Sequence, residues 1–240
     1  MGSEEDILAQ MRELVSMLPS NFEDNSSYIE CTDDLNRVCP ELENCAGDTS
    51  IALSQIADNQ EFFEVKAEYA KDMVTNGATV GCVANRSELY NEEGEKTETF
   101  DKVLSARGCK KAAEFVKFCD AFDIPVLTLT NVKGYKATKC SESNMARSAA
   151  ELTNAYIRPT VPKVNVIVGE AFGSAYLTMN SKSTGADMVF AWPNAQIGMM
   201  DAKLAAKIMY ADADAATINE KAAEYAMLQS SALSAAKRGY

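Results

Sequence analysis

The 240-residue sequence predicts a layered α/β domain. Beyond about residue 110, segments with helical spacing of apolar residues alternate with short, nearly continuous apolar runs. Strands that are apolar throughout are typical of a sheet covered on both faces. A composition of 47% hydrophobic and 24% charged residues is that of a globular protein, and the length suffices for one or two domains.

The N-terminal region predicts a helix followed by an arm. Residues 4–18 place Ile7, Met11, Leu14 and Leu18 on one stripe, and a proline follows directly. Residues 20–49 are polar and irregular, so we expect an arm that lies on a partner. The chain therefore divides into a helix and irregular arm at residues 1–50 and a domain at residues 51–240.

The domain itself predicts a regular order of elements. Strands are expected at 61–65 and 78–85, followed by an exposed loop or hairpin tip at 87–99. Apolar spacing then predicts helices at 110–122, 143–156, 173–179, 202–210 and 219–237, and strands at 125–130, 163–168, 188–192 and 196–199.

The composition excludes several kinds of chemistry. The sequence has no histidine, which removes Ser-His-Asp triads, Cys-His dyads and any imidazole base. The net charge of −12 disfavours nucleic acid as a partner. The seven cysteines form no CxxC pair, so we expect no metal and a reducing cytoplasmic compartment. No apolar run reaches the roughly 18 residues that a membrane span needs.

Two strand ends are candidate functional sites, at residues 131–135 and 169–175. In the second, the predicted strand ends at Gly169 and a helix begins around Gly173. Two backbone N–H groups at such a helix start can form an oxyanion hole, and the small residues Gly173, Ser174 and Ala175 let a ligand approach them closely. The alternative is that these small residues only allow the helix to pack tightly on the sheet.

Several longer runs resemble a known family. They closely resemble the C-terminal half of biotin-dependent acyl-CoA carboxyltransferases, and they read FVKFCDAFDIPVLTL, TVPKVNVIVGEAFGSAYLTM, ADMVFAWPNAQIGMM and AAKRGY. Further similar runs upstream extend the resemblance to nearly the whole chain. The resemblance implies a crotonase-like (ClpP/crotonase) fold of stacked ββα units in a spiral, and a functional dimer.

The resemblance also implies chemistry that needs no histidine. In this family the biotin ureido group takes the proton, and the protein supplies backbone amides. Biotin arrives on a partner protein, and an acyl-CoA is the substrate. The resemblance assigns the oxyanion-hole amides to Ser174 and Ala175, and a substrate or biotin pocket to Gly134, Tyr135, Gly173, Tyr176 and Leu177.

Three functions follow as expectations from the resemblance. In the first, the chain is the biotin-side half of a split carboxyltransferase, working with a CoA-side half and a biotin carboxyl carrier protein in a dimer or larger oligomer. In the second it is a non-catalytic scaffold or regulatory half, because Ser174 replaces the usual glycine and Asn131 and Lys133 also depart from the family pattern. In the third it is a subunit of a biotin-dependent decarboxylase.

Overall fold

A six-stranded sheet forms the centre of the molecule. The computed structural model describes residues 3–21, 23–24, 32–34, 36–40, 42–77, 80–91 and 93–239. Strand β1 pairs antiparallel with β2, and the other neighbours are parallel. The order is β1-β2-β6-β8-β10, and β9 pairs with the first half of β8. The sheet strands are β1 (Met73–Gly77), β2 (Gly81–Asn85), β6 (Val126–Val132), β8 (Lys163–Phe172), β9 (Met188–Ala191) and β10 (Gln196–Gly198).

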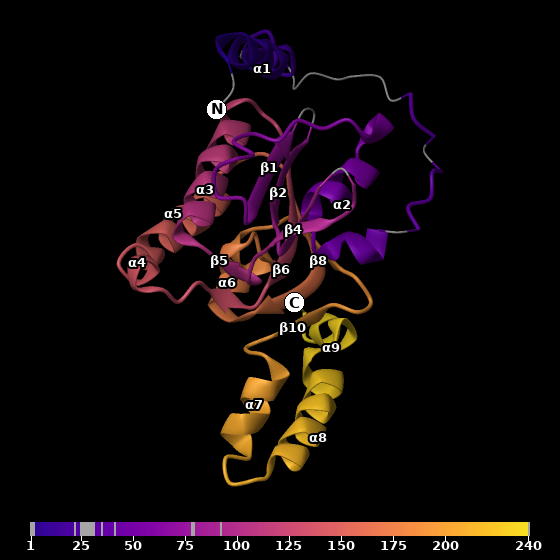
Figure 1. Ribbon diagram of the computed structural model, residues 1–240, viewed down its shortest axis with the longest axis vertical. Coiled ribbons are helices and arrows are strands. Elements are labelled where there is room, and N and C mark those ends of the chain that lie inside the picture. The colour runs from indigo at the N-terminus through magenta and orange to yellow at the C-terminus, as the bar shows by residue number, and fades with distance from the viewer. Residues whose placement is uncertain are drawn as a thin grey trace.

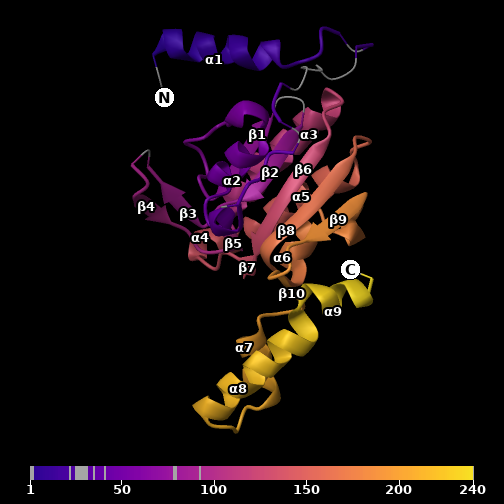
Figure 2. The ribbon, with the colours of Figure 1, turned by 90° about the vertical axis from the view of Figure 1, so that its right-hand side faces the viewer.

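Helices cover both faces of this sheet (Figures 1 and 2). Helices α3 (Ala106–Ala121) and α5 (Met145–Ile157) pack together on one face, where they bury the larger apolar cluster. On the other face, α2 (Thr49–Ile56) contributes Leu53 to a smaller cluster with strand residues such as Val74 and Val168. The mixed α/β class and the two-sided covering of the strands are therefore confirmed.

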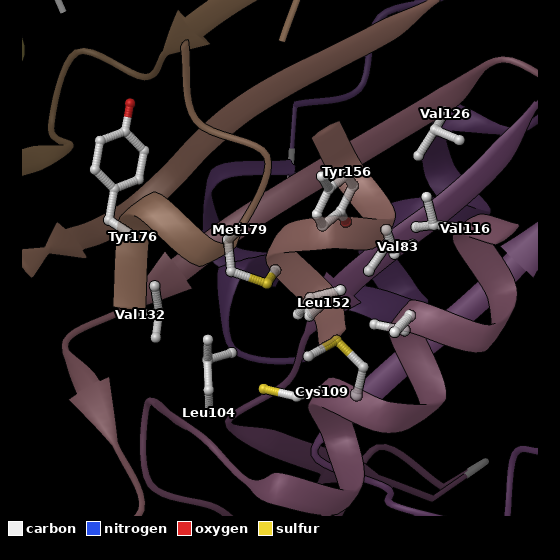
Figure 3. Close-up of a cluster of buried hydrophobic side chains, with 14 of the residues drawn as sticks. Val83, Leu104, Cys109, Val116, Val126, Val132, Leu152, Tyr156, Tyr176 and Met179 are labelled. Carbon is white, nitrogen blue, oxygen red and sulfur yellow. The ribbon is translucent and has the colours of Figure 1, made fainter. Parts of the chain in front are cut away.

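The larger cluster contains cysteines that behave as apolar side chains (Figure 3). Cys109 and Cys119 are fully buried beside Val116 and Leu152. Burial raises the pKa of both thiols to about 12, because an ionised thiolate loses its hydration there. Each fully buried Leu or Val contributes about 1.5–3 kcal/mol to folding.

The remaining elements surround this core. Helices α7 and α8 project away from the sheet, as both ribbon views show (Figures 1 and 2). Their bounds and those of the other elements are α1 (Glu4–Ser16), β3 (Glu88–Tyr90), β4 (Lys96–Thr99), β5 (Val103–Leu104), β7 (Gly134–Tyr135), α4 (Lys139–Glu142), α6 (Gly173–Thr178), α7 (Ala202–Met209), α8 (Ala215–Tyr225) and α9 (Ala232–Lys237), with short 3₁₀ or π turns at Leu42–Ala46, Asp58–Gln60, Lys182–Thr184 and Ala226–Ser230.

Two expected elements near the start of the domain differ in the structure. Residues 61–65 do not form a strand: the segment is irregular and contacts β1 locally, where the Val65 N–H donates to the Thr75 carbonyl (2.8 Å). The strand at that edge is β1, which the sequence analysis missed. Of the predicted strand 78–85, residues 81–85 form β2, and residues 78 and 79 lie outside the described residues. The hairpin expected at 87–99 is confirmed by the pairing of β3 and β4.

Two later elements also have different bounds. The predicted helix 219–237 is divided because Ser231 is extended, bridges to Gln196 of β10 and caps α9 with its side chain. Strand β8 continues past Gly169 to Phe172 because β10 pairs with its last three residues.

The division into an arm and a domain remains a prediction. Much of the arm lies outside the described residues. At its end, the Ser87 and Glu88 N–H groups donate to the Gly47 carbonyl (2.9 and 3.0 Å), and Asp48 is buried. Within the part of the chain that the structure describes, no helix is long and apolar enough to cross a membrane.

Candidate functional site

Strand β8 leads directly into helix α6 at Gly173. Phe172 is still extended, whereas Gly173 has φ of +60°, a left-handed conformation that favours glycine. A Cβ atom added at Gly173 would lie 3.1 Å from the Met199 carbonyl oxygen. Both the backbone conformation and the limited space therefore favour glycine here, and the predicted helix start is confirmed.

The first turn of α6 leaves backbone donors without partners inside the helix. No side chain caps this turn. Ser174 is exposed, whereas Ala175 is only 1% exposed. Of the two residues assigned to the oxyanion hole, Ser174 therefore lies at the surface and Ala175 is buried.

Tyr135 joins the two strand ends that the sequence singled out. It lies in β7, which pairs with β5, and its hydroxyl donates to the Ser174 carbonyl (3.0 Å). The same hydroxyl is 2.7 Å from Thr178 Oγ1, and Thr178 also bonds to the Ser174 carbonyl (3.0 Å). Tyr135, which lies 39 positions before Ser174 in the chain, thus helps to fix the position of α6.

Two asparagines hold the strand ends beneath this turn. Asn85 at the end of β2 accepts from the Asn131 N–H (2.8 Å) and donates to the Asn131 carbonyl. Asn131 in turn accepts from the Glu170 N–H of β8 (2.9 Å). Gly169 makes this possible, since a Cβ there would lie 2.5 Å from Asn131 Oδ1. These contacts link β2, β6 and β8 at one edge of the sheet.

This asparagine clamp was not among the sites predicted from the sequence. The available signal is that Asn85 and Asn131 both stand at the ends of apolar runs, and the ends of neighbouring parallel strands meet at one edge. Only the tertiary structure shows that the Asn85 side chain meets the Asn131 backbone.

The other predicted pocket residues differ in how exposed they are. Gly134 has open space where a Cβ would lie, and Leu177 is 41% exposed on α6. Tyr176 is 4% exposed and belongs to the apolar core, where Figure 3 shows it near Val132. The pocket roles of all these residues stay predictions. Among the described residues, no group of three or more carboxylate or thiol side chains is arranged to hold a metal ion.

Comparisons with known proteins agree on one family. The carboxyl transferase domain model matches residues 1–240. The chain is 38% identical over 233 residues to a putative propionyl-CoA carboxylase beta chain of Bacillus subtilis (strain 168), covering 93% of this chain and 45% of that protein. It is 35% identical over 248 residues to methylmalonyl-CoA decarboxylase subunit alpha of Propionigenium modestum, covering 95% and 46%. The chain thus spans less than half the length of these relatives.

Solved structures show the same likeness. A crystal structure of transcarboxylase 12S, a hexamer with hydrolysed methylmalonyl-CoA bound, superposes with a TM-score of 0.84 at 33% identity, covering 96% of this chain and 46% of that one. The geranyl-CoA carboxylase beta subunit of P. aeruginosa shares the fold, with a TM-score of 0.68 at 22% identity over 93% of this chain and 44% of that one. The crotonase-like fold class is confirmed, and the chain belongs to the carboxyl transferase domain family of biotin-dependent acyl-CoA carboxylases and decarboxylases.

Proposed function

We propose that this chain is the biotin-side half of a carboxyltransferase that moves a carboxyl group between carboxybiotin and an acyl-CoA. The observation that carries this proposal is the turn at Gly173–Ala175. It combines a left-handed glycine, a first helical turn without a side-chain cap, and an exposed Ser174 whose carbonyl is held by Tyr135. Family membership supplies the reaction class.

The donor set of this turn fits biotin. A ureido oxygen is a neutral acceptor on which negative charge develops, and fixed backbone N–H groups stabilise such charge without reorganising. When bound, biotin supplies the ureido group that carries the carboxyl group. In this proposal the N–H groups of Ser174 and Ala175 bind the ureido oxygen. Gly173 keeps the approach open because it has no side chain.

A second polypeptide completes the site in this proposal. The family's reaction uses both a biotin site and a CoA site, and the chain spans less than half the length of the carboxylase beta chain and the decarboxylase subunit alpha that it resembles. A biotin carboxyl carrier protein delivers the biotin, and a dimer or larger assembly brings the halves together. The free thiols at described positions such as Cys82 and Cys109 support a reducing cytoplasmic compartment.

Two alternatives each rest on one observation. The exposed Ser174, where the family usually has glycine, favours a non-catalytic scaffold or regulatory half, because serine adds a side chain in the first turn of α6. The likeness to methylmalonyl-CoA decarboxylase subunit alpha favours the decarboxylase direction. The Ser174→Gly variant distinguishes an active native site from one that has lost its activity. If a reconstituted complex transfers carboxyl groups only when it carries this variant, the native site is inactive.

The decisive test is reconstitution of carboxyl transfer. The chain is purified alone and together with a co-expressed crotonase-like partner, and decarboxylation of malonyl-CoA and methylmalonyl-CoA is measured. We expect no turnover by the chain alone and turnover once the partner and a biotinylated carrier are added. Turnover by the purified chain alone would contradict the split-site proposal.

A further inference from the structure

A cavity lies apart from the Gly173–Ala175 turn. It has a volume of about 720 Å³ and opens between the N-terminal ends of α3 and α5, with α4 at its edge. Strand β7 stands between the two sites. Tyr135 extends to α6, whereas the next residue, Lys136, lines the cavity. None of the residues assigned to the carboxyl-transfer turn lines this cavity.

The cavity is positively charged although the chain is not. Four cationic side chains line it against two carboxylates, in a chain whose net charge is −12. Two of the four are partly neutralised, since Arg147 pairs with Glu151 at 3.2 Å and Lys110 lies 4.0 Å from Glu114. Within the described part of the chain, Arg107 and Lys136 form no ion pair. Of the two carboxylates, Glu151 is the partner of Arg147, and Asp72 forms no ion pair among the described residues, so the lining keeps two unpaired cations against one unpaired carboxylate.

A serine side chain in the wall makes no hydrogen bond to the described part of the protein. Ser148, the fourth residue of α5, is 9% exposed and lines the cavity. Its N–H donates to the Asn144 carbonyl (3.0 Å), but across the residues that the structure describes its side chain makes no hydrogen bond. Ser148 Oγ is not one of the buried side-chain atoms that lack a partner, so the hydroxyl is accessible from the cavity that Ser148 lines and can donate to a ligand there.

The start of α5 adds backbone donors to the same wall. The Asn144 side chain does not cap this helix and instead donates to Ser143 Oγ (3.0 Å). The helix has 13 residues, so its N-terminus carries the positive end of a full helix dipole. The cavity therefore offers several hydrogen-bond donors: the unpaired N–H groups of α5, the Ser148 hydroxyl and two cationic side chains. This number suits an anion with more acceptor oxygens than a carboxylate has.

We propose that this cavity binds the phosphate group or diphosphate of a phosphorylated small molecule. Arg107 and Lys136 would contact the phosphate oxygens as charged donors, and Ser148 and the first turn of α5 would donate the remaining hydrogen bonds. The cavity is larger than a phosphate needs, which leaves room for the organic part of the ligand. This site is separate from the carboxyl-transfer turn and does not depend on its activity.

The test measures binding of pyrophosphate to the full 240-residue chain by isothermal titration calorimetry. Inorganic phosphate and citrate serve as comparison anions. We expect pyrophosphate to bind more tightly than citrate, and its affinity to fall as NaCl is raised, because exposed charges are screened. Tighter binding of citrate, or no binding of pyrophosphate at low salt, would overturn the proposal.

Three variants and one matched control locate the site. Arg107→Gln and Lys136→Gln should each weaken pyrophosphate binding by about tenfold, as expected for one charge-assisted contact. Ser148→Ala should weaken it by roughly three- to tenfold and leave the urea midpoint unchanged, because the hydroxyl has no partner to lose. Lys203→Gln removes an exposed positive charge on α7, outside the cavity. If Lys203→Gln weakens binding as much as Arg107→Gln, or Ser148→Ala binds like the wild type, the proposal is wrong.

Discussion

Helices α5 and α6 both begin without a side-chain cap, but they begin in different surroundings. The start of α6 is built from backbone: a left-handed glycine, two small residues and the tether from Tyr135. The start of α5 is surrounded by charged side chains and opens on a large cavity. Seven other described α-helices have a side-chain cap, at Ser3, Asp48, Ser105, Thr138, Asp201, Asp214 and Ser231.

This difference shows two ways of using the same free donors. Backbone donors at fixed positions suit charge that develops during a reaction, because they need not reorganise. Cationic side chains suit a ligand that already carries charge, because their attraction acts before contact. We therefore expect the two helix starts to respond independently to substitution.

The largest expected effect comes from removing a backbone donor of α6. Ala175→Pro deletes one N–H group in the first turn, where proline is tolerated. In a reconstituted complex, we expect carboxyl transfer to fall by about 10²–10³, the usual loss for one oxyanion-hole donor. Pyrophosphate binding at the α5 cavity should not change.

The matched control is Ala216→Pro, which deletes an N–H group in the first turn of α8. Circular dichroism and urea unfolding establish that both variants are folded. If folded Ala175→Pro transfers carboxyl groups at the wild-type rate, the oxyanion assignment is wrong.

The next effect concerns the clamp beneath α6. In Gly169→Ala the new Cβ would meet Asn131 Oδ1 at 2.5 Å, so the amide has to move and the Glu170 N–H loses its partner. We expect the free energy of unfolding to fall by about 2–4 kcal/mol, measured by urea denaturation. Gly134→Ala is the control, since its Cβ would point into open space. Equal losses in the two variants would show that the clamp does not stabilise the strand ends.

A smaller effect tests why Gly173 is glycine. Gly173→Ala carries both a left-handed backbone and a contact with the Met199 carbonyl, whereas Gly94→Ala, with φ of +77°, carries only the backbone strain. We expect Gly94→Ala to lose about 1–2 kcal/mol of unfolding free energy and Gly173→Ala to lose more. If both variants lost the same unfolding free energy, residues 198–200 would have moved away from the new Cβ without an energetic cost.

The smallest effect has the opposite sign for stability. Asn144→Asp places a negative charge at the start of α5, which should stabilise the helix by about 0.3–1 kcal/mol. The same charge repels an anion, so pyrophosphate should bind more weakly while carboxyl transfer in the complex is unchanged. Calorimetry and urea unfolding of one protein preparation measure both effects. Tighter pyrophosphate binding by this variant would contradict the proposed cavity site.

Elements with a strong local pattern were predictable from the sequence. The helix expected at 143–156 is α5 at Met145–Ile157, and the strand expected at 163–168 is the first part of β8. Strand β1 was not predictable, because its sequence MVTNG has only two large apolar residues and owes its place to pairing with β2. Local spacing reports burial along one segment, but not which segment lies beside it.

The site divides in the same way. The small residues at 173–175 and the strand ends near residues 131 and 169 were visible as candidates in the sequence. The asparagine clamp and the cavity at α5 were not, because each joins side chains from several elements. No periodicity within one segment reports that Arg107 and Lys136 face the same space.

The sequence by itself determined the family, the order of most helices and strands, and a chemistry without histidine, since each of these depends on residue identity or local spacing. Only the tertiary structure decided that the Tyr135 hydroxyl meets the Ser174 carbonyl, and that Asn85, Asn131 and Gly169 share one edge. The physical reason is register. Parallel pairing of β2, β6 and β8 sets which strand ends coincide, and a shift of one residue would turn the clamp residues to the opposite faces of the sheet.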